Sequence, residues 1–412
     1  MSDALIIDAC RTPRGIGKPG KGALTDIHPQ HLSATVLRAI AERNGLDTAD
    51  VDDIIWGTST QVGTQGGDLG RMGALDAGYD IRSSAVTIDR FCGSGLTAGN
   101  LAAGMIMSGL QDLVIAGGCE MMSSHAKNRS VSTFTTMDRG NLHLRHLHPQ
   151  TQQGVAADAI ATIEKIDREA VDTLAAESQR RADIAIKEGR FDRSLVPVLH
   201  EDGTMALDHE EYPRPGTTLD VLAGLKPSFA GLAEQPIDES GTTYGDLVRW
   251  RYPDLEIDHV HHAGNSSGVV DGAAAILFAS PEYARAHGLT PRAQVRAMAN
   301  MGDDPTLMLN APGPAARKAL AKAGLTVDDI DLFEVNEAFA VVPEKFIRDL
   351  GVDREKINVN GGAIALGHPI GATGSILIGT ALDELERRDG RFALVTMCTG
   401  GGMAPAMVIE RI

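Results

Sequence analysis

Short apolar runs of strand length recur along the chain and alternate with longer helical stretches. Residues 112–117, 273–279 and 392–397 are such runs, and their length is typical of strands buried on both faces. The helical stretch 101–109 carries Leu, Ala, Gly and Met on nearly every side, and 376–385 is apolar along one face. Because helices of this kind are buried between sheets, the pattern predicts a layered α/β architecture.

Two segments far apart in the chain are near-copies of each other. Val51-Asp-Asp-Ile-Ile and Val327-Asp-Asp-Ile-Asp each follow a helical stretch that ends in Gly-Leu. Counting 41 residues on from each valine leads to Cys92 in the first copy and to His368 in the second. Small residues, a helical stretch and an apolar run follow in both. We therefore expect a duplicated α/β unit, in which the turns at Cys92 and His368 converge about a pseudo-twofold axis.

The composition changes between the two copies. Residues 124–264 contain a His- and Gln-rich stretch, a charged helical segment at 167–188 and a region rich in Pro, Gly, Asp and Glu. This change indicates an inserted loop domain, after which strand character resumes. We expect the first half to comprise residues 1–123 and 265–290, the loop domain residues 124–264, and the second half residues 291–412.

The charge and the cysteine content narrow the possible partners. The formal net charge of −17 argues against a nucleic-acid partner, because such binding requires a basic surface. The four cysteines are widely scattered, which fits neither a disulfide framework nor a paired zinc motif. We therefore expect a reducing, cytoplasmic compartment and no metal site. The N-terminal residues show no basic start and no long apolar region, so we expect no export signal and no membrane partner.

Cys92 opens the small-residue run Cys-Gly-Ser-Gly-Leu-Thr-Ala-Gly. Two glycines allow a tight strand-to-helix turn, Ser94 can cap the helix, and a helix N-terminus lowers the pKa of a nearby thiol. Cys92 is then a nucleophile, and the alternative is a buried, inert cysteine. In the second copy, Pro369 favours a helix start, which makes His368 the helix cap with a free side chain. Because a histidine beside a thiol activates it, the repeat favours the nucleophile.

Two further segments of the second half carry candidate chemistry. Cys398 stands before three glycines, and such a run permits positive φ and exposes N–H groups that can hold an oxyanion. Together with Cys92 and His368, it indicates a second acid or base. Asn336 follows an apolar run and precedes Glu337. An Asn side chain at a strand end can hold a catalytic water, whereas the alternative makes both residues a helix cap with a first-turn acid.

Together these segments resemble the signature blocks of the thiolases, the acetyl-CoA acyltransferase family. The blocks are Cys92-Gly-Ser-Gly, Asn336-Glu-Ala-Phe, residues 360–374 around Gly-His-Pro, and Cys398-Thr-Gly-Gly-Gly. The resemblance spans nearly the whole chain, and the block around His368 is highly specific. It implies a five-layer αβαβα fold of two duplicated halves in a homodimer or homotetramer. The inserted loop domain is implied to bind substrate and to contribute oligomer contacts.

The resemblance also implies a role for each signature residue. Cys92 is acylated, His368 is the base that activates it, and Cys398 moves the α-proton of acetyl-CoA. Asn336, through a water, and His368 polarise one thioester carbonyl, while the N–H groups of Cys92 and Gly400 hold the other. The implied reaction is CoA-dependent cleavage of 3-ketoacyl-CoA, and the reverse condensation, with ping-pong kinetics through acyl-Cys92. Coenzyme A and acyl-CoA act as substrates, and no cofactor is expected.

Contacts with coenzyme A follow from two further family patterns. Arg214-Pro-Gly-Thr-Thr-Leu and the later Pro-Ser-Phe229 match Arg-x-Gly-x-Thr-Leu ahead of Pro-x-Phe. Arg214 is therefore the candidate for the nucleotide end, and the alternative is a solvated surface charge. The run Ala263-Gly-Asn-Ser-Ser267-Gly resembles Ala-Gly-Asn-Ala-Ser-Gly, so Ala263 and Ser267 are expected along the pantetheine. Phe229 and Phe339 are expected as its walls.

Two departures from the family pattern affect the predicted substrate. Short-chain biosynthetic members carry Met-Gly-x-Thr-Ala-Glu where residues 152–158 read Gln-Gln-Gly-Val-Ala-Ala-Asp. We therefore predict a degradative or broad-range 3-ketoacyl-CoA thiolase, with acetoacetyl-CoA formation as the alternative. An extra segment within 231–258 either covers the acyl pocket or forms an oligomer contact. Two rivals are a decarboxylating ketoacyl synthase, which requires another residue type at Cys398, and a non-catalytic acyl-CoA or lipid carrier, which does not need three reactive side chains.

Overall fold

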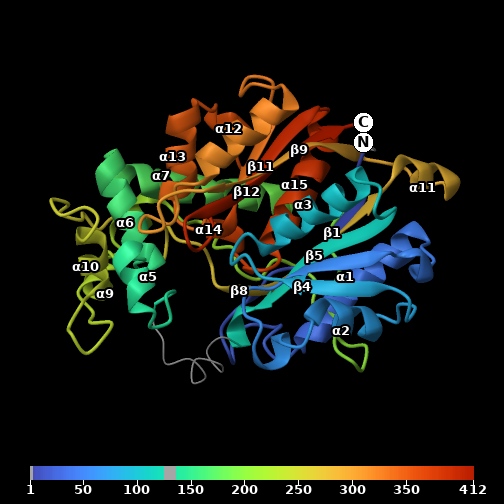
Figure 1. Cartoon of the computed structure of the whole chain (residues 1–412), viewed down its shortest axis with the longest axis horizontal. Helices are drawn as coiled ribbons and strands as arrows, with labels where there is room; N and C mark the ends of the chain where they lie inside the picture. The colour runs from blue at the N-terminus through green and yellow to red at the C-terminus, as the bar shows by residue number, and fades with distance from the viewer. Residues whose placement is uncertain (1–2, 125–135) are drawn as a thin grey trace.

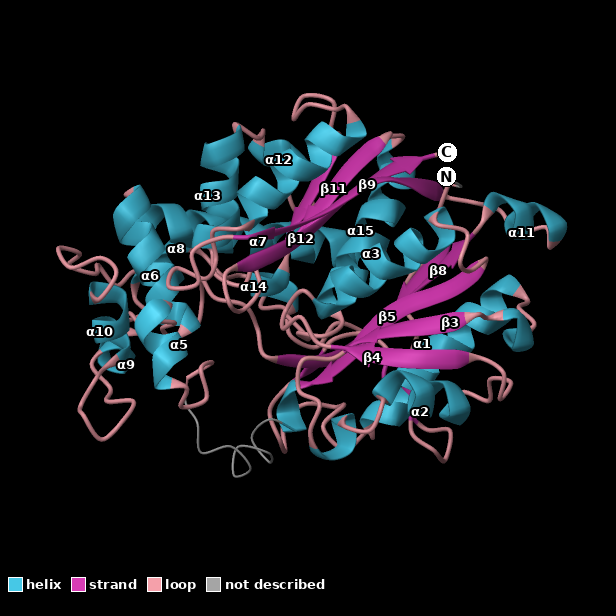
Figure 2. Cartoon of the chain, in the orientation of Figure 1, coloured by secondary structure: helices cyan, strands magenta, loops and turns pink. Residues whose placement is uncertain are grey.

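Ten of the described strands form one hydrogen-bonded sheet that divides into two sets, and β6 and β7 of the inserted segment form a separate two-stranded sheet (Figure 2). The computed structural model describes residues 3–124 and 136–412. The strand order is β4-β3-β5-β8-β1 in the first set and β9-β12-β11-β10 in the second, and a short β1–β9 pairing joins them. The first set comprises β1 Leu5–Arg11, β2 Gly15–Ile16, β3 Asp53–Gly57, β4 Ser84–Ile88, β5 Leu113–Met121 and β8 Val270–Ala279. The second set comprises β9 Ala293–Gly302, β10 Leu332–Val335, β11 Phe392–Thr396 and β12 Met403–Arg411.

The helices complete five layers around these strands (Figure 1). Helices α1 and α2 cover the outer face of the first set, α3 and α15 lie between the two sets, and α12 and α13 cover the second set. The predicted αβαβα architecture is therefore confirmed. The helices of the two halves are α1 Pro29–Asn44, α2 Leu69–Asp76, α3 Ser94–Met107, α11 Pro281–Ala286, α12 Pro312–Ala323, α13 Val341–Leu350, α14 Ala363–Leu366 and α15 Thr373–Arg388.

The inner layer consists of two helices that cross at close range. A Cβ added to Gly374 of α15 would lie 2.0 Å from the backbone nitrogen of Leu96 in α3, so only glycine permits this approach. Leu96, Phe278 and Ile378 are fully buried around the crossing, and burying each contributes about 1.5–3 kcal/mol. The expectation of a helix enclosed on every side is wrong near the middle of α3, where Leu101 is 42% exposed.

The inserted segment packs on both halves rather than on one. Its described elements are α5 Leu142–Leu147, α6 Gln153–Glu164, α7 Arg168–Lys187, β6 Val198–Leu199, β7 Met205–Leu207, α8 Leu219–Ala223, α9 Ala230–Ala233 and α10 Tyr244–Arg249. The predicted charged helix corresponds to α7. Strands β6 and β7 join the core of the first half, where Glu210 forms ion pairs with Arg11 at 2.6 Å and Arg14 at 2.7 Å. Helices α6 and α7 join the core of the second half.

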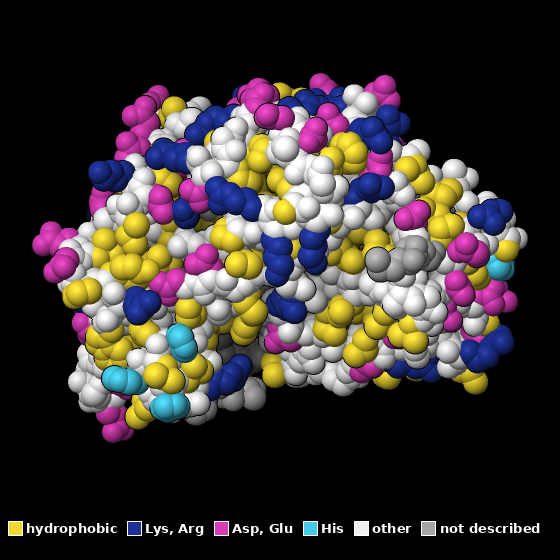
Figure 3. Space-filling model, turned by 45° about the horizontal axis from the view of Figure 1, so that its top comes forward, with side chains coloured by type: hydrophobic (Ala, Val, Ile, Leu, Met, Phe, Trp, Pro, Cys, Tyr) yellow, Lys and Arg dark blue, Asp and Glu magenta, His cyan; other side chains and the backbone are white. Residues whose placement is uncertain are grey.

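The face of the molecule seen in Figure 3 carries no large patch of a single charge. Basic and acidic side chains are interspersed there, with apolar side chains between them. Among the described residues, no helix has the length and apolar character that crossing a bilayer requires.

Candidate active site

Cys92 lies in a tight turn between β4 and α3. The Phe91 N–H donates to Asp89 Oδ1 at 2.7 Å, and the Ser94 hydroxyl donates to the Phe91 carbonyl at 2.7 Å. These bonds hold Phe91 at a φ of 48°, in the left-handed region that a bulky side chain disfavours. Polar side chains on both sides of the thiol therefore maintain a strained backbone directly before Cys92.

Two predictions about this turn are wrong. The N-cap of α3 is Gly93, because the Ser94 hydroxyl bonds within the preceding turn and accepts from the Arg90 N–H at 2.8 Å. The pKa of Cys92 is raised to about 12, first by burial and then by the Glu120 carboxylate, so desolvation of the thiolate outweighs the helix N-terminus. Formation of the thiolate therefore requires a base in the site.

His368 lies in the turn between α14 and α15, and this turn inserts into the first half. A Cβ on Gly118 would lie 2.1 Å from the Gly371 carbonyl oxygen, and a Cβ on Gly95 would lie 2.8 Å from it. Residues without a side chain are therefore required at these positions. Gly95 belongs to the first turn of α3, three residues after Cys92. The two duplicated turns thus come together, as the repeat predicted.

Hydrogen bonds assign the tautomer of His368. The Thr373 hydroxyl donates its single hydrogen to the Pro369 carbonyl at 2.9 Å, so it accepts from His368 Nδ1, which lies 2.6 Å away. The Nε2 atom then carries the lone pair, and Asn336 Nδ2 lies 3.4 Å from it. Burial lowers the pKa of His368 to about 4, which keeps the ring neutral at pH 7. A neutral imidazole whose Nε2 lone pair meets, among the described residues, only this long contact from the Asn336 amide is a form that can act as a general base.

The predicted helix cap at His368 is wrong. Helix α15 begins at Thr373 with Ala372 as its N-cap. Pro369 instead opens a separate turn, which the Ala372 N–H closes by donating to the Pro369 carbonyl at 2.9 Å. The imidazole is thus presented from a loop, whereas the thiol is presented from a helix end.

Asn336 lies directly after β10, beside the end of β11. Its backbone N–H donates to the Thr396 carbonyl at 3.2 Å, and α13 begins only at Val341, so the helix-cap alternative is wrong. Its Oδ1 is buried and has no hydrogen-bond partner among the residues described, which suits an acceptor for water or substrate. Glu337 is structural, because it accepts from the Ser178 hydroxyl at 2.6 Å away from this acceptor.

Cys398 and the glycines after it form the loop between β11 and β12. Two of these glycines, Gly401 and Gly402, have a φ of 75°, as the glycine run predicts. Burial, and then the Cys92 sulfur, raise the pKa of Cys398, so the two thiols lie within electrostatic range of each other. A Cβ on Gly93 would lie 2.4 Å from the Thr399 methyl carbon. The loop therefore packs directly on the Cys92 turn.

Gly400 lies between two side chains at this junction. A Cβ at this position would lie 2.4 Å from Met137 Cε and 3.0 Å from Phe91 Cγ. The first residues after the undescribed stretch of the inserted segment therefore contact the Cys398 loop. This contact places Met137 beside the predicted oxyanion-binding backbone, a role that sequence reasoning did not assign to it.

Glu120, at the end of β5, is a further residue that sequence reasoning missed. It is fully buried and accepts the Gly371 N–H, three residues after His368, at 2.9 Å. It also raises the pKa values of both Cys92 and His368, in each case as the second cause after burial. A carboxylate at the end of an apolar run is the signal that could have identified it, since an acidic side chain is rarely fully buried unless it is paired.

Four of the residues expected to contact coenzyme A lie close together. The rings of Phe229 and Phe339 meet edge to face with centroids 5.7 Å apart. The Ser267 N–H donates to the Ala338 carbonyl, next to Phe339, at 2.9 Å, and Ala263 is exposed at the start of the same loop. The predicted walls and the predicted loop therefore adjoin.

Arg214 lies at the surface. Its backbone N–H donates to Gln179 Oε1 at 3.0 Å, and its guanidinium carbon lies 5.5 Å from the centre of the Tyr212 ring. The side chain itself is exposed. This arrangement is compatible with both a nucleotide contact and a solvated charge.

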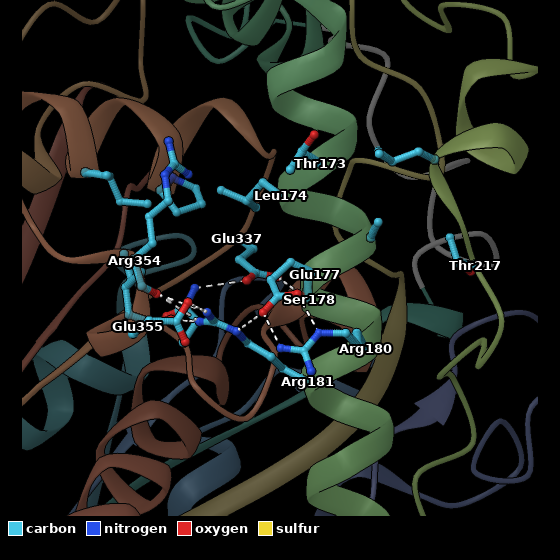
Figure 4. Close-up of a pocket in the computed structure, with 16 residues that line it drawn as sticks. Thr173, Leu174, Glu177, Ser178, Arg180, Arg181, Thr217, Glu337, Arg354 and Glu355 are labelled. Carbon is cyan, nitrogen blue, oxygen red and sulfur yellow. Dashed lines mark hydrogen bonds and ion pairs between the residues drawn. The ribbon is translucent and has the colours of Figure 1, made fainter.

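A cavity of about 640 Å³ opens elsewhere, between α7, α13 and the segment before α14 (Figure 4). Its lining includes Ser178, Arg181, Glu337 and Arg354, and none of the predicted catalytic side chains. The Arg181 guanidinium already donates to backbone carbonyls, including that of Ile357 at 2.6 Å. The reactive groups are therefore grouped outside this cavity.

Comparisons with known proteins agree with this geometry. The thiolase N-terminal domain matches residues 4–233 and the thiolase C-terminal domain matches residues 289–411. An acetyl-CoA acetyltransferase of Cupriavidus necator is 39% identical over 100% of both chains. A 3-oxoadipyl-CoA/3-oxo-5,6-dehydrosuberyl-CoA thiolase of Escherichia coli is 40% identical, also over 100% of both chains. The crystal structure of the Bacillus anthracis acetyl-CoA acetyltransferase superposes with a TM-score of 0.85 at 31% identity, covering 100% of this chain and 99% of that one. The chain belongs to the thiolase family.

Proposed function

We propose that this protein is a 3-ketoacyl-CoA thiolase, an acyltransferase that cleaves 3-ketoacyl-CoA with coenzyme A and catalyses the reverse condensation. The observation that carries the proposal is the convergence of the Cys92 turn, the His368 turn and the Cys398 loop on closely packed glycines. A nucleophilic thiol, a neutral imidazole and a second thiol are the groups that such a reaction requires.

The first half-reaction transfers the acyl group to Cys92. His368 Nε2 takes the Cys92 proton, and the sulfur attacks the 3-keto carbon of the substrate. The bond between C2 and C3 breaks, its electron pair forms the enolate of acetyl-CoA, and the Cys398 thiol protonates that enolate. In the second half-reaction, coenzyme A gives its proton to the Cys398 thiolate and attacks the acyl-Cys92 thioester. Cys92 then leaves and recovers its proton from His368.

Two groups of donors stabilise the oxyanions that develop in these steps. Asn336, through a water, and His368 serve one carbonyl oxygen, and the backbone N–H groups of Cys92 and Gly400 serve the other. The buried Oδ1 of Asn336 supports the first assignment. The positive φ of the two glycines after Gly400 supports the second, because such backbone turns direct N–H groups into a common space.

Coenzyme A and acyl-CoA are the proposed small-molecule partners, without a resident cofactor. Arg214 is proposed for the nucleotide end, and Ala263, Ser267, Phe229 and Phe339 for the pantetheine channel. The adjacent Phe229 and Phe339 rings support that channel. Coenzyme A is thus a substrate that enters beside the loop at 263–267.

A homodimer or homotetramer is proposed from the edge of the first set of strands. Strand β4 ends the strand order among the described residues, and Val86 on it is 41% exposed. Nearby in sequence, Ile81 is 81% exposed. An apolar edge strand left open invites association, and a second copy of the chain is the proposed cover.

A cytoplasmic location is proposed from the thiols. All four cysteines are free, which is the state that a reducing compartment maintains.

Acetoacetyl-CoA formation is the alternative reaction, favoured by the acetyltransferase relatives. A longer acyl chain is favoured by the extra segment around α9 and α10. Arg145 binds both Asp138 at 2.8 Å and Asp238 of that segment at 2.7 Å, and Asp138 follows Met137, which contacts the Gly400 loop. The extra segment is thus connected to the loop at Gly400, which supports the pocket-cover role over a purely oligomeric one.

Variants of the two thiols provide the test of this function. Cys92→Ala is expected to abolish transfer of label from radioactive acetyl-CoA to the protein, and Cys398→Ala is expected to be labelled but to fail in condensation. Cys10→Ala, which removes a buried thiol from another core, is the control and should behave as the wild type. Stoichiometric labelling of Cys92→Ala, or condensation by Cys398→Ala, contradicts the assigned role.

A further inference from the structure

We propose that Glu120 is a positioning residue for the thiolase reaction, which holds the His368 turn against the Cys92 side of the site. The inference rests on the proposed function and adds to it a group that touches neither substrate nor coenzyme A. Glu120 comes from the first half of the chain, whereas the turn that it binds comes from the second. Its contacts are therefore a direct link between the two duplicated units at the point where their reactive groups meet.

The carboxylate binds three separate segments. Glu120 Oε2 accepts the Gly371 N–H at 2.9 Å and the Ser59 N–H at 2.9 Å. Glu120 Oε1 accepts the Thr60 N–H and the Gln65 side-chain amide, each at 3.2 Å. Backbone N–H groups are donors that cannot reorient, so a carboxylate, which only accepts, satisfies all of them at once.

The surrounding glycines show why the turn needs such an anchor. Around Gly371, a Cβ would lie 2.7 Å from the Gly57 carbonyl oxygen and 2.8 Å from the Cys119 carbonyl oxygen. The turn is thus pressed against the backbone of the first half. The bond from Gly371 N–H to Glu120 is a polar contact at this surface that lies three residues from the imidazole, and the Ser375 hydroxyl adds another by donating to the Gly95 carbonyl at 3.2 Å.

The charge of Glu120 also acts on both partners of the proton transfer. It raises the pKa of Cys92 and that of His368, so it favours the neutral thiol and the imidazolium. Asp89 also raises the pKa of Cys92 and so disfavours its thiolate. Cys398 faces Cys92 from the loop after β11. If Glu120 had only a structural role, its substitution would change the reaction rate but not the pH dependence of Cys92 ionisation. The pH dependence therefore distinguishes a positioning role from a purely structural one.

The test compares Glu120→Gln and Glu120→Asp with the wild type. In Glu120→Gln the charge is lost and one amide N–H faces a backbone donor, so kcat for thiolysis should fall about 100-fold, as for an ångström-scale misplacement. Because the like charge is removed, alkylation of Cys92 by iodoacetamide should reach its plateau at lower pH. Glu120→Asp keeps the charge but is shorter, so it should show the wild-type alkylation profile with an intermediate kcat.

Glu344→Gln is the matched control. Glu344 on α13 is also buried but binds Arg348 of the same helix and Arg354 of the turn after it, and none of these residues is a proposed catalytic residue. Its variant should keep the wild-type kcat and alkylation profile. A wild-type kcat in Glu120→Gln overturns the proposal, as does a reduced kcat with an unchanged alkylation profile. If Glu120→Gln does not fold, a wild-type kcat in Glu120→Asp overturns it. Failure of the proposed function is distinguishable, since the wild type itself then neither cleaves 3-ketoacyl-CoA nor becomes acetylated.

Discussion

Thr373→Val tests the assignment of His368 as a neutral base with Nδ1 protonated. The substitution keeps the shape of the side chain but removes the oxygen that accepts from His368 Nδ1 at 2.6 Å. When the imidazole takes the thiol proton, both ring nitrogens carry hydrogen, and the Nδ1–H then points at a methyl group. An unsatisfied buried donor costs about 1–3 kcal/mol. The resting imidazole of the variant avoids this cost by carrying its hydrogen on Nε2, so the loss appears in the transition state, where both ring nitrogens carry hydrogen, and corresponds to a decrease in kcat of roughly 5- to 150-fold.

The assay is steady-state thiolysis of a 3-ketoacyl-CoA, followed by loss of its enolate absorbance, with kcat and KM measured separately. Thr373→Ser retains the hydroxyl and is expected to keep kcat near the wild-type value. KM should change little in either variant, because the partners of the hydroxyl are His368 Nδ1 and the Pro369 carbonyl. A kcat of Thr373→Val within twofold of the wild type, in protein of unchanged melting temperature, refutes the tautomer assignment.

Two further predictions concern stability. Since burial lowers the pKa of His368 from 6.5 to about 4, the unfolded state binds the proton first as the pH falls. The contribution of His368 to the free energy of unfolding should therefore be constant above pH 6.5 and decrease by about 3 kcal/mol as the pH falls towards 4. Denaturant titrations of the wild type and His368→Gln measure this contribution, and a difference in unfolding free energy that is the same at every pH contradicts the prediction. Gly374→Ala inserts a Cβ 2.0 Å from the Leu96 nitrogen and should destabilise the protein by about 1–3 kcal/mol or prevent folding. Gly104→Ala in α3, which has open space at its Cβ, should be neutral or stabilising by about 0.5–1 kcal/mol in the same thermal melt.

The apolar pattern was sufficient to predict the layers of the fold. The runs at 112–117, 273–279 and 392–397 coincide within one residue at each end with parts of β5, β8 and β11. The side chains of these strands are buried apart from the half-buried Phe392, because strands covered on both faces must be apolar throughout. The repeat predicted more than secondary structure: it placed the Cys92 and His368 turns together. That prediction depends on symmetry between packed units, which a spacing of residues can reveal.

Local rules failed where tertiary contacts compete with them. Ser94 has the side chain of a good helix cap, but its hydroxyl bonds Phe91 and Arg90 in the turn instead. The helix N-terminus favours a Cys92 thiolate, but burial costs more. Glu120 escaped prediction because its donors come from segments that are remote in sequence. Each failure concerns the balance between a local preference and an environment that only the folded chain supplies.

The two copies diverge at the position where the chemistry needs two different groups. Helix α3 begins two residues after Cys92, whereas α15 begins five residues after His368. The difference of three residues is the turn from Pro369 to Gly371, which inserts into the first half and receives the carboxylate of Glu120. A symmetric pair of helix ends offers two similar positive environments, and these suit two anions better than a thiol and its base. The inserted turn separates His368 from the N-terminus of α15, and the imidazole donates its Nδ1–H to the Thr373 hydroxyl. One half of the duplicated fold thereby presents a proton donor and the other a proton acceptor.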